Sequence, residues 1–445
     1  MQRLSRRHFL AGAGAMGTLR LAAPALAQPG IRRLTILHTN DIHARISPTR
    51  EGLGGFAHLA SALNRERAKA EASLYLDAGD LVQGTPVSSL YEGVPIFELM
   101  NGLHPDAICL GNHEFDYGWR RIYDYLKVSR FPIFCGNLVG EGGAFLTPPP
   151  YLIRDVNGVR VAIIGLIMES LDKLTYSYNL SPWRVLPLVE TARKYISQAK
   201  SDGAQLIVGL THIFPKEEEM LLAALPEMHL IISGHDHGGM KTLLRDGNRM
   251  VVRTRPNGAE LGRVDLAFDL AKNQVVDIQW NRIPIIASEI PAEPAVAREV
   301  ASWEAKVSAV VDREIGESKT AYTRFQMKDV VERAMLESLG VDFAFVNRGA
   351  VRAGLIVGKI RARDIWDALP FGNRVVFGKI PGAKLPEAIR KSASVEPDRI
   401  YSVATIDYVA ENQREIGTEG LQFPETGPFL REMMIDWVSK RKIVE

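Results

Sequence analysis

The stretch LTILHTNDIH at residues 34–43 is a short apolar, β-prone run that ends in polar side chains. Four later runs end in the same way, in the segments Asp77-Ala78-Gly79-Asp80, Gly111-Asn112-His113-Glu114-Phe115-Asp116, Gly209-Leu210-Thr211-His212 and Gly234-His235-Asp236-His237. Short β-prone runs predict strands. Loops at the carboxyl ends of strands are where α/β folds build their sites, so these polar side chains are candidate functional residues.

The polar residues at these strand ends are carboxylates, imidazoles and an amide, which are ligands for divalent metal ions. Asp41 and His43 lie two residues apart, as do His235 and His237, so each pair can turn to one ion only where the backbone bends. One carboxylate, Asp80, could bridge two cations. Five such clusters at successive strand ends predict a metal-dependent active site, because polar residues rarely gather in this way without a function.

Strand-like runs alternate with helix-length segments over the first three hundred residues. The predicted strands are Leu34–His38, Leu74–Asp77, Ala107–Leu110, Pro132–Cys135, Val161–Leu166, Leu206–Leu210 and Leu230–Ile232. Between several of them lie segments of helical length, such as Gly55–Ala72 and Leu188–Ser201, and Asn157-Gly158 is a hairpin signal. This alternation predicts a layered α/β domain with a mixed sheet.

A group of prolines, Pro284, Pro291 and Pro294, marks a boundary after this first domain. A helical stretch follows at about 295–314, and a second set of elements begins near Thr320. We therefore predict a catalytic domain at 31–290, a linking helix at 291–317 and a smaller domain at 318–445.

The composition is that of a globular protein, with 46% hydrophobic and 24% charged residues in 445. It excludes a disordered chain and a protein with many membrane spans. The formal net charge is +2, and without the four arginines of residues 1–27 it becomes −2. Neither value indicates a nucleic-acid-binding surface.

Residues 1–27 have the features of an export signal. The paired Arg6 and Arg7 are followed by a small, apolar run and by Ala25-Leu26-Ala27, an A-x-A cleavage pattern before Gln28. An N-terminal anchor or an ordinary helix is the alternative, although the apolar run is short for a membrane span. We expect a twin-arginine signal peptide, recognised by the twin-arginine export machinery, and a mature protein without a membrane span in the periplasm or outside the cell.

The two cysteines, Cys109 and Cys135, each lie in a short apolar stretch. Such a cysteine is usually a small buried side chain, although an oxidising compartment also permits a bridge. The sequence leaves this pairing open, and the absence of a CxxC motif gives no support for a thiolate zinc site.

Two stretches, ILHTNDIH at 36–43 and GNHEFDYG at 111–118, resemble the 5′-nucleotidase family of calcineurin-like dinuclear metallophosphoesterases. NRGAVR at 347–352 and LPFGN at 369–373 resemble the nucleotide-binding segments of that family. The resemblance implies a four-layered α/β sandwich metallophosphoesterase domain. A helix would join it to a smaller C-terminal α/β substrate-binding domain that can rotate between open and closed forms.

The resemblance also implies roles for individual residues. One metal ion would be held by Asp41, His43 and His237, the other by Asn112, His212 and His235, and Asp80 would bridge them. His113 would be the catalytic histidine and Asp116 its partner. Donors of this kind suit zinc, manganese, iron or cobalt, so the sequence predicts two divalent ions without naming them.

In the smaller domain the resemblance implies that Phe371 and Tyr408 hold the base, that Arg352 binds the phosphate and that Asn347 makes a polar contact. The sequence departs from the family after Tyr408. A Gly-Gly-Asp-Gly run whose Asp binds the ribose is replaced by Ala410-Glu411-Asn412-Gln413-Arg414-Glu415, and the helix after the linker lacks the usual Asn-x-Gly-Asn pattern. The resemblance implies hydrolysis of phosphate esters, chiefly of nucleotides or cyclic nucleotides. The departure leads us to expect weak or altered discrimination of ribose, with a ligand other than a plain nucleoside monophosphate as the alternative.

Two other functions fit the same motifs. A thiosulfohydrolase of sulfur oxidation resembles this family and carries a similar export signal, but the run DLVQGTP at 80–86 is closer to the nucleotidases. A periplasmic binding protein with an inactive site is the second alternative. It is disfavoured because every ligand position is filled.

Overall fold

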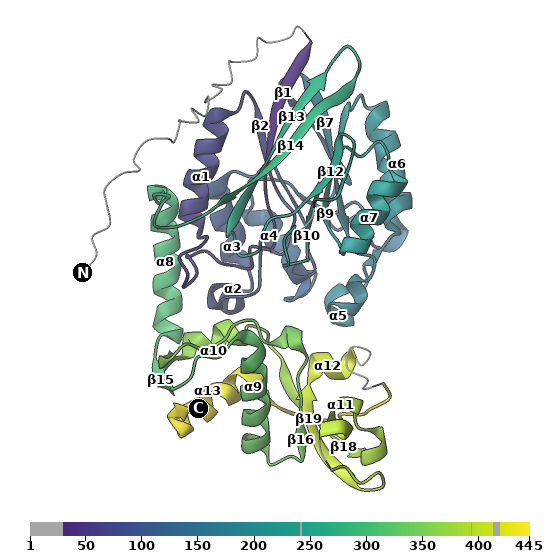
Figure 1. The fold of residues 1–445 in the computed structure, drawn as a ribbon. Coiled ribbons are helices and arrows are strands. Elements are labelled where there is room, and N and C mark those ends of the chain that lie inside the picture. The colour runs from purple at the N-terminus through teal and green to yellow at the C-terminus, as the bar shows by residue number, and fades with distance from the viewer. Residues whose placement is uncertain (1–29, 241–242, 393, 413–418) are drawn as a thin grey trace, which may run out of the picture.

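The computed structural model describes residues 30–240, 243–392, 394–412 and 419–445. The first domain contains two six-stranded sheets packed face to face (Figure 1). The first sheet has the order β14-β13-β1-β2-β3-β4. Its strands are β1 (Ile31–Thr39), β2 (Ser73–Asp77), β3 (Ala107–Cys109), β4 (Ile133–Phe134), β13 (Glu260–Asp269) and β14 (Gln274–Pro284). Strands β1 to β4 are parallel, β13 pairs antiparallel with β1, and β14 pairs antiparallel with β13, so the sheet is mixed, as predicted.

The second sheet has the order β11-β12-β10-β9-β7-β6. Its strands are β6 (Tyr151–Val156), β7 (Val159–Ile167), β9 (Leu206–His212), β10 (Leu230–Gly234), β11 (Arg245–Asp246) and β12 (Arg249–Val252). The predicted hairpin at Asn157-Gly158 joins β6 to β7. The short strands β5 (Leu138–Val139) and β8 (Arg184–Val185) pair separately.

Alternate residues of the strands fill two different cores, which makes the domain four layers thick. Leu34 and Ile36 of β1 pack between the two sheets with Val161 and Val208, whereas Leu37 packs in the core that contains the helices. This is the period-two alternation of a strand buried on both faces. Helix α1 (Phe56–Lys69) covers the first sheet, and α6 (Leu188–Ser201) and α7 (Pro215–Ala224) cover the second (Figure 1). The smaller helices are α2 (Pro86–Tyr91), α3 (Val94–Met100), α4 (Arg121–Val128) and α5 (Ser177–Leu180).

Helix α8 (Pro294–Val311) joins the two domains along one side of the molecule (Figure 1). Glu293 caps its start by accepting a hydrogen bond from the backbone N–H of Val296 at 2.7 Å, and a proline follows at the first helical position. The helix ends at Val311 because strand β15 (Glu314–Ser318) begins almost at once. The domain boundaries at 290 and 317 stay predictions.

The smaller domain contains a three-stranded and a four-stranded sheet with its own core. Its other strands are β16 (Phe343–Ala344), β17 (Gly358–Arg361), β18 (Arg374–Pro381), β19 (Ile400–Ile406), β20 (Glu425–Phe429) and β21 (Ile443–Val444). Its helices are α9 (Arg324–Leu339), α10 (Ala362–Ala368), α11 (Glu387–Ser392), α12 (Asp407–Glu411) and α13 (Leu430–Arg441). No helix in the described ranges is long and apolar enough to cross a membrane.

Polar contacts join the two domains around one face of the first. Ser89 Oγ donates a hydrogen bond to the carbonyl oxygen of Pro370 at 2.9 Å, and Tyr176 Oη donates to Asp407 Oδ1 at 2.9 Å. Arg45 forms an ion pair with Asp367 at 3.6 Å. The smaller domain is therefore held against the edge where the parallel strands end.

The two cysteines are buried and free. Cys109 lies on β3, and its thiol is 3.6 Å from the carbonyl oxygen of Leu166. Both behave as small buried side chains, which is the simpler of the two readings that the sequence left open.

Candidate active site

The five polar strand ends meet at one edge of the paired sheets. Asp41 follows β1, Asp80 follows β2, and His113 follows β3. His212 is the last residue of β9, and His235 follows β10. The backbone φ angles of Asp41, His43, Asp80 and His235 are 53°, 50°, 56° and 78°, in the left-handed region that non-glycine residues rarely adopt. These are the backbone bends that the two-residue spacings required, and such strained residues concentrate at functional sites.

The ligand atoms form two groups that share one carboxylate. Asp41, His43, Asp80 and His237 place one donor atom each within 4.8 Å of one another, and so do Asp80, His212 and His235. Asn112 Oδ1 lies 3.0 Å from His235 Nδ1, which adds the amide to the second group. The predicted ligands are thus brought together in the predicted sets, with Asp80 between them.

A test of whether these residues fit a cation comes from His212. Its Nδ1 lies 2.7 Å from the carbonyl oxygen of Ala78, which can only accept, so Nδ1 carries the hydrogen. The opposite nitrogen, Nε2, is buried without a hydrogen-bond partner and faces Asp80 Oδ2 at 3.1 Å. Burial disfavours the charged ring, but the Asp80 carboxylate outweighs it and raises the pKa of His212 to about 10. A cation between a ring nitrogen and a carboxylate removes the need for that proton, so the donor set fits a divalent metal.

The first ligand group, which contains His43 and His237, also fits a divalent cation. His43 Nε2 and His237 Nε2 are 2.8 Å apart, and Asp41 Oδ1 lies 3.6 Å from His237 Nε2. Two imidazole nitrogens and a carboxylate oxygen facing one point are an acceptor-rich arrangement that a cation satisfies.

Glu114 fixes the loop that carries Asp80. Its carboxylate accepts hydrogen bonds from the backbone N–H groups of Asp80, Leu81 and Gly111 at 3.0, 2.8 and 2.6 Å. A Cβ atom at Gly111 would lie 2.2 Å from Asp80 Oδ1, so only glycine fits there. Glu114 therefore positions the shared carboxylate and is not itself among the clustered ligands.

His113 and Asp116 lie beside the metal ligands. Asp116 Oδ2 is 2.8 Å from His113 Nδ1, a contact that sets the orientation of the ring. The backbone N–H of His113 donates to Asp80 Oδ1 at 2.9 Å, and its Nε2 lies 3.9 Å from Asp80 Oδ2. The ring of His113 thus lies beside the carboxylate that the two ligand groups share.

The smaller domain brings two of its four predicted residues to this site. The rings of Phe371 and His113 are 5.8 Å apart, and the guanidinium of Arg352 lies 5.9 Å from the Phe371 ring centroid. Tyr408 instead packs edge-to-face against Tyr176 at 5.9 Å. A clamp of Phe371 and Tyr408 around a base stays a prediction.

Asn347 lies at the turn before the single helical turn Arg348–Ala350. Ala410 and Glu411 are the last two residues of α12, and Asn412 follows the helix as its C-cap. Residues 413–418, which include the last part of the stretch that departs from the family, lie outside the described residues, as does the predicted export signal at 1–27.

Comparison with known proteins identifies the two parts of the chain. Residues 34–239 match the calcineurin-like phosphoesterase family, and residues 304–419 match the C-terminal domain of 5′-nucleotidases. Together they account for well over half of the chain. The chain belongs to the 5′-nucleotidase family.

Several relatives of this 5′-nucleotidase family member span both domains. The chain is 28% identical to a snake venom 5′-nucleotidase from Naja atra, over 82% of its own length and 78% of the venom protein. It is 26% identical to human 5′-nucleotidase over 85% and 75% of the two chains. It is also 25% identical to a trifunctional nucleotide phosphoesterase of Bacillus subtilis, of which it spans only 28%. The protein is a phosphoric ester hydrolase of the 5′-nucleotidase type.

Solved structures confirm the predicted fold class. A 5′-nucleotidase precursor from Thermus thermophilus superposes with a TM-score of 0.82 at 24% identity, covering 93% of this chain and 97% of that one. A sulfate thiohydrolase from the same genus gives 0.78 at 17% identity over 92% and 94%. At these identities the likeness concerns the fold alone, so it does not separate phosphate from sulfur substrates.

Two buried arginines that position parts of the site were not identified from the sequence. Arg253 is buried, forms an ion pair with Glu218 and donates to Asp236 Oδ2 at 3.1 Å, which holds the loop between His235 and His237. Its segment, Val251-Val252-Arg253-Thr254, also ends an apolar run, and this was the signal that could have found it. Arg431 is also buried and lies over the Trp366 ring at 3.5 Å. It donates hydrogen bonds to the carbonyl oxygens of Pro370 and Phe371.

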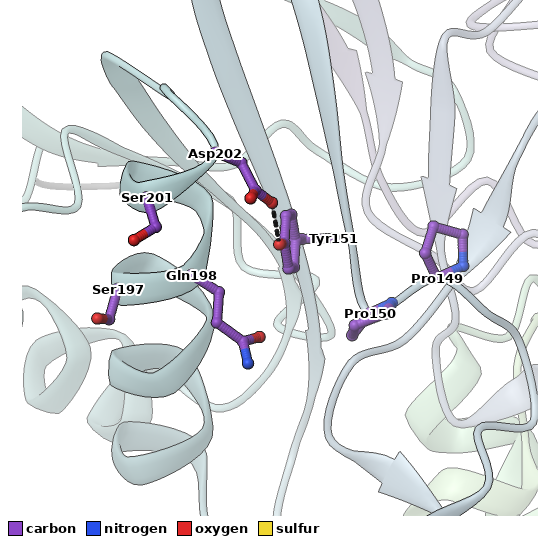
Figure 2. A pocket seen from close by; sticks show the side chains of 7 residues that line it. All are labelled: Pro149, Pro150, Tyr151, Ser197, Gln198, Ser201 and Asp202. Carbon is purple, nitrogen blue, oxygen red and sulfur yellow. Dashed lines mark hydrogen bonds between the residues drawn. The ribbon is translucent and has the colours of Figure 1, made fainter.

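A separate hollow lies on the outer surface between β6 and α6. Figure 2 shows its lining residues, which are Pro149, Pro150, Tyr151, Ser197, Gln198, Ser201 and Asp202. Tyr151 Oη donates to Asp202 Oδ2 at 2.6 Å, so the one charged group there is already engaged. The hollow has no histidine or cysteine in its lining and is not a candidate for the hydrolytic chemistry.

Proposed function

We propose that this enzyme hydrolyses nucleotide phosphate esters with the help of two divalent metal ions, outside the cytoplasm. The observation that carries the proposal is the pair of ligand groups joined by Asp80, with Phe371 and Arg352 beside them. Relatives named as 5′-nucleotidases, over comparable lengths of both chains, support a nucleotide as substrate.

In the proposed mechanism the ions, when bound, would supply a water of lowered pKa and positive charge for the phosphoryl oxygens. The ligands of one ion would be Asp41, His43 and His237, and of the other Asn112, His212 and His235. Zinc, manganese, iron and cobalt all suit these donors.

The chain's own groups would do the remaining work. His113, oriented by Asp116, would stabilise the transferring phosphoryl oxygens or give a proton to the leaving alcohol oxygen. Arg352 would bind the phosphate, for which a guanidinium offers two parallel N–H donors. The ring of Phe371 would pack against a nucleobase, and Tyr408 and Asn347 would contribute from the same side of the smaller domain.

A substrate panel tests the proposal. We expect phosphate release from AMP, its 2′-deoxy analogue and a simple sugar phosphate, with kcat/KM for the two nucleotides differing by less than about 10-fold. The physical reason is that the family's ribose-binding carboxylate and its flexible glycines are missing after Tyr408. Metal analysis and chelator-treated enzyme are the controls.

A fall of about 100-fold on removal of the 2′-hydroxyl would mean that a buried ribose contact exists after all. Turnover of a thiosulfate ester with no phosphatase activity would establish the sulfur-oxidation alternative. Tight nucleotide binding without turnover by metal-loaded protein would establish the inactive binding protein.

The export signal gives a separate prediction. We expect mature protein to begin at Gln28, and we expect replacement of Arg6 and Arg7 by Lys to leave folded precursor in the cytoplasm, because the arginine pair is the recognised address. Cell fractionation and N-terminal sequencing measure both. Arg20→Lys, which changes a third arginine of the same segment, is the matched control and should export normally. Normal export of the Arg6, Arg7 double variant would exclude the twin-arginine route.

A further inference from the structure

The hydroxyl group of Tyr176 joins the first domain to the smaller one. Tyr176 directly precedes α5, on the part of the first domain that faces α12 (Figure 1). Its Oη donates a hydrogen bond to Asp407 Oδ1 at 2.9 Å and accepts one from Asn373 Nδ2 at 3.0 Å. Asn373 Nδ2 also donates to Asp407 Oδ1 at 3.2 Å. Burial, followed by the charge of Asp407, raises the pKa of Tyr176, so the hydroxyl keeps its hydrogen and stays a donor.

The two partners of this hydroxyl lie next to the predicted base-binding residues. Asn373 follows Phe371 by two residues, and Asp407 directly precedes Tyr408. Asn373 directly precedes β18, Asp407 directly follows β19, and these two strands pair antiparallel. Tyr176 therefore contacts both of the segments that carry the predicted base-binding rings, at the ends of neighbouring strands.

The segment that begins with Tyr176 also reaches the catalytic histidine. Asn179 is buried, and its Nδ2 donates a hydrogen bond to the carbonyl oxygen of Asp116 at 3.1 Å. Its backbone carbonyl oxygen accepts from the N–H of Trp119 at 2.8 Å, and its own N–H donates to the carbonyl oxygen of Tyr176 at 2.9 Å. Asp116 Oδ2 lies 2.8 Å from His113 Nδ1. A continuous series of hydrogen bonds thus runs from Asp407 of the smaller domain to the ring of His113.

Such a connection matters because a nucleobase and the reacting phosphate lie at opposite ends of a nucleotide. Contacts with the base accelerate the reaction only where the base site and the catalytic group are held at a fixed separation, since orientation of the substrate is what those contacts supply. Phe371 and His113, whose ring centroids are 5.8 Å apart, belong to different domains. The packing of the domains therefore sets this separation.

We propose that Tyr176 is a positioning residue that fixes the base-binding segments relative to His113, so that contacts with the base increase kcat. This inference rests on the proposed function, because it requires a nucleotide at the metal site. The enzyme then prefers a nucleotide over the same sugar phosphate without a base, and that preference depends on the Tyr176 hydroxyl.

Tyr176→Phe tests the inference in metal-loaded mature enzyme with AMP and ribose 5-phosphate as substrates. Phenylalanine keeps the ring, which stacks on Tyr178 at 5.1 Å and meets Tyr408 edge-to-face at 5.9 Å, and removes only the hydroxyl. We expect the ratio of kcat/KM for AMP to that for ribose 5-phosphate to fall by about 5–30-fold, the range for loss of one or two hydrogen bonds. Most of the fall should lie in kcat for AMP, and ribose 5-phosphate should be almost unaffected.

Tyr151→Phe is the matched control, because Tyr151 Oη also donates to a carboxylate, Asp202 Oδ2 at 2.6 Å, in the hollow of Figure 2. It should leave the ratio and both rates unchanged, and thermal unfolding of both variants measures any general loss of stability. Equal losses for both substrates in Tyr176→Phe would mean that the hydroxyl serves only general domain docking. That result, or an unchanged ratio, would overturn the inference.

The same measurements separate this inference from the proposed function. Hydrolysis of AMP and ribose 5-phosphate at equal rates by the unchanged enzyme would contradict the inference and leave the phosphate ester hydrolase intact. Hydrolysis of neither compound by metal-loaded enzyme would contradict both. A preference for AMP that falls in Tyr176→Phe and persists in Tyr151→Phe would support both.

Discussion

Asp80→Asn is expected to reduce phosphatase turnover by more than roughly 10³-fold, since removal of even one donor to the reacting oxygens commonly costs 10²–10³. Asp80 belongs to both ligand groups, and its Oδ2 lies 3.1 Å from His212 Nε2. Asparagine keeps the shape of the side chain but loses the negative charge and one of the two acceptor oxygens. The measurement is kcat with an aryl phosphate together with the metal content of the purified protein, and His212→Ala should give a similar loss.

The matched control is Asp77→Asn, the same change at the end of the same strand. Asp77 is buried, accepts from the Thr39 hydroxyl at 2.5 Å and is not a member of either ligand group. Burial raises the pKa of Asp77 to about 7, so asparagine at this position removes a charge that burial already disfavours. It should retain two metal ions and most of the activity. If Asp80→Asn also did so, Asp80 would not be the bridging ligand.

The metal-binding residues could be predicted because they follow a rule of topology. Parallel strands of one sheet end at a common edge, so the polar residues after β1, β2 and β3 of the first sheet were expected to lie near one another, and likewise those at the ends of β9 and β10 of the second. The meeting of these two edges depends on how the sheets pack face to face, which the spacing of the motifs does not show. The bends at Asp41 and His43 were also foreseeable, since two ligands two residues apart cannot otherwise face one ion. The pattern of polar strand ends and the spacing of their residues were sufficient to predict these candidate ligands.

The position of the predicted substrate-binding residues of the smaller domain was harder to predict from the sequence. Phe371 reaches His113 only because the domains pack through contacts such as Tyr176 with Asp407, residues 231 positions apart. No spacing rule predicts such a contact. Arg253 and Arg431 share this difficulty, because a lone arginine has no periodic pattern and its role depends on what surrounds it in space.

His113→Ala is expected to retain both metal ions and to lower kcat by roughly 10²–10⁴-fold, the range for loss of a general acid or base. His113 holds the shared carboxylate only through its backbone N–H, which alanine also provides, so the ligand groups should survive. Asp116→Asn is the companion variant: it weakens the 2.8 Å contact to Nδ1 that orients the ring and should give a smaller loss of kcat.

A series of substrates with different leaving groups distinguishes the two possible roles of His113. If His113 protonates the leaving oxygen, His113→Ala should be most impaired with alkyl phosphates such as AMP and least with an aryl phosphate, whose phenolate leaves without a proton. An equal loss across the series would assign His113 to the phosphoryl oxygens instead, and near wild-type rates with both ions bound would remove it from the mechanism.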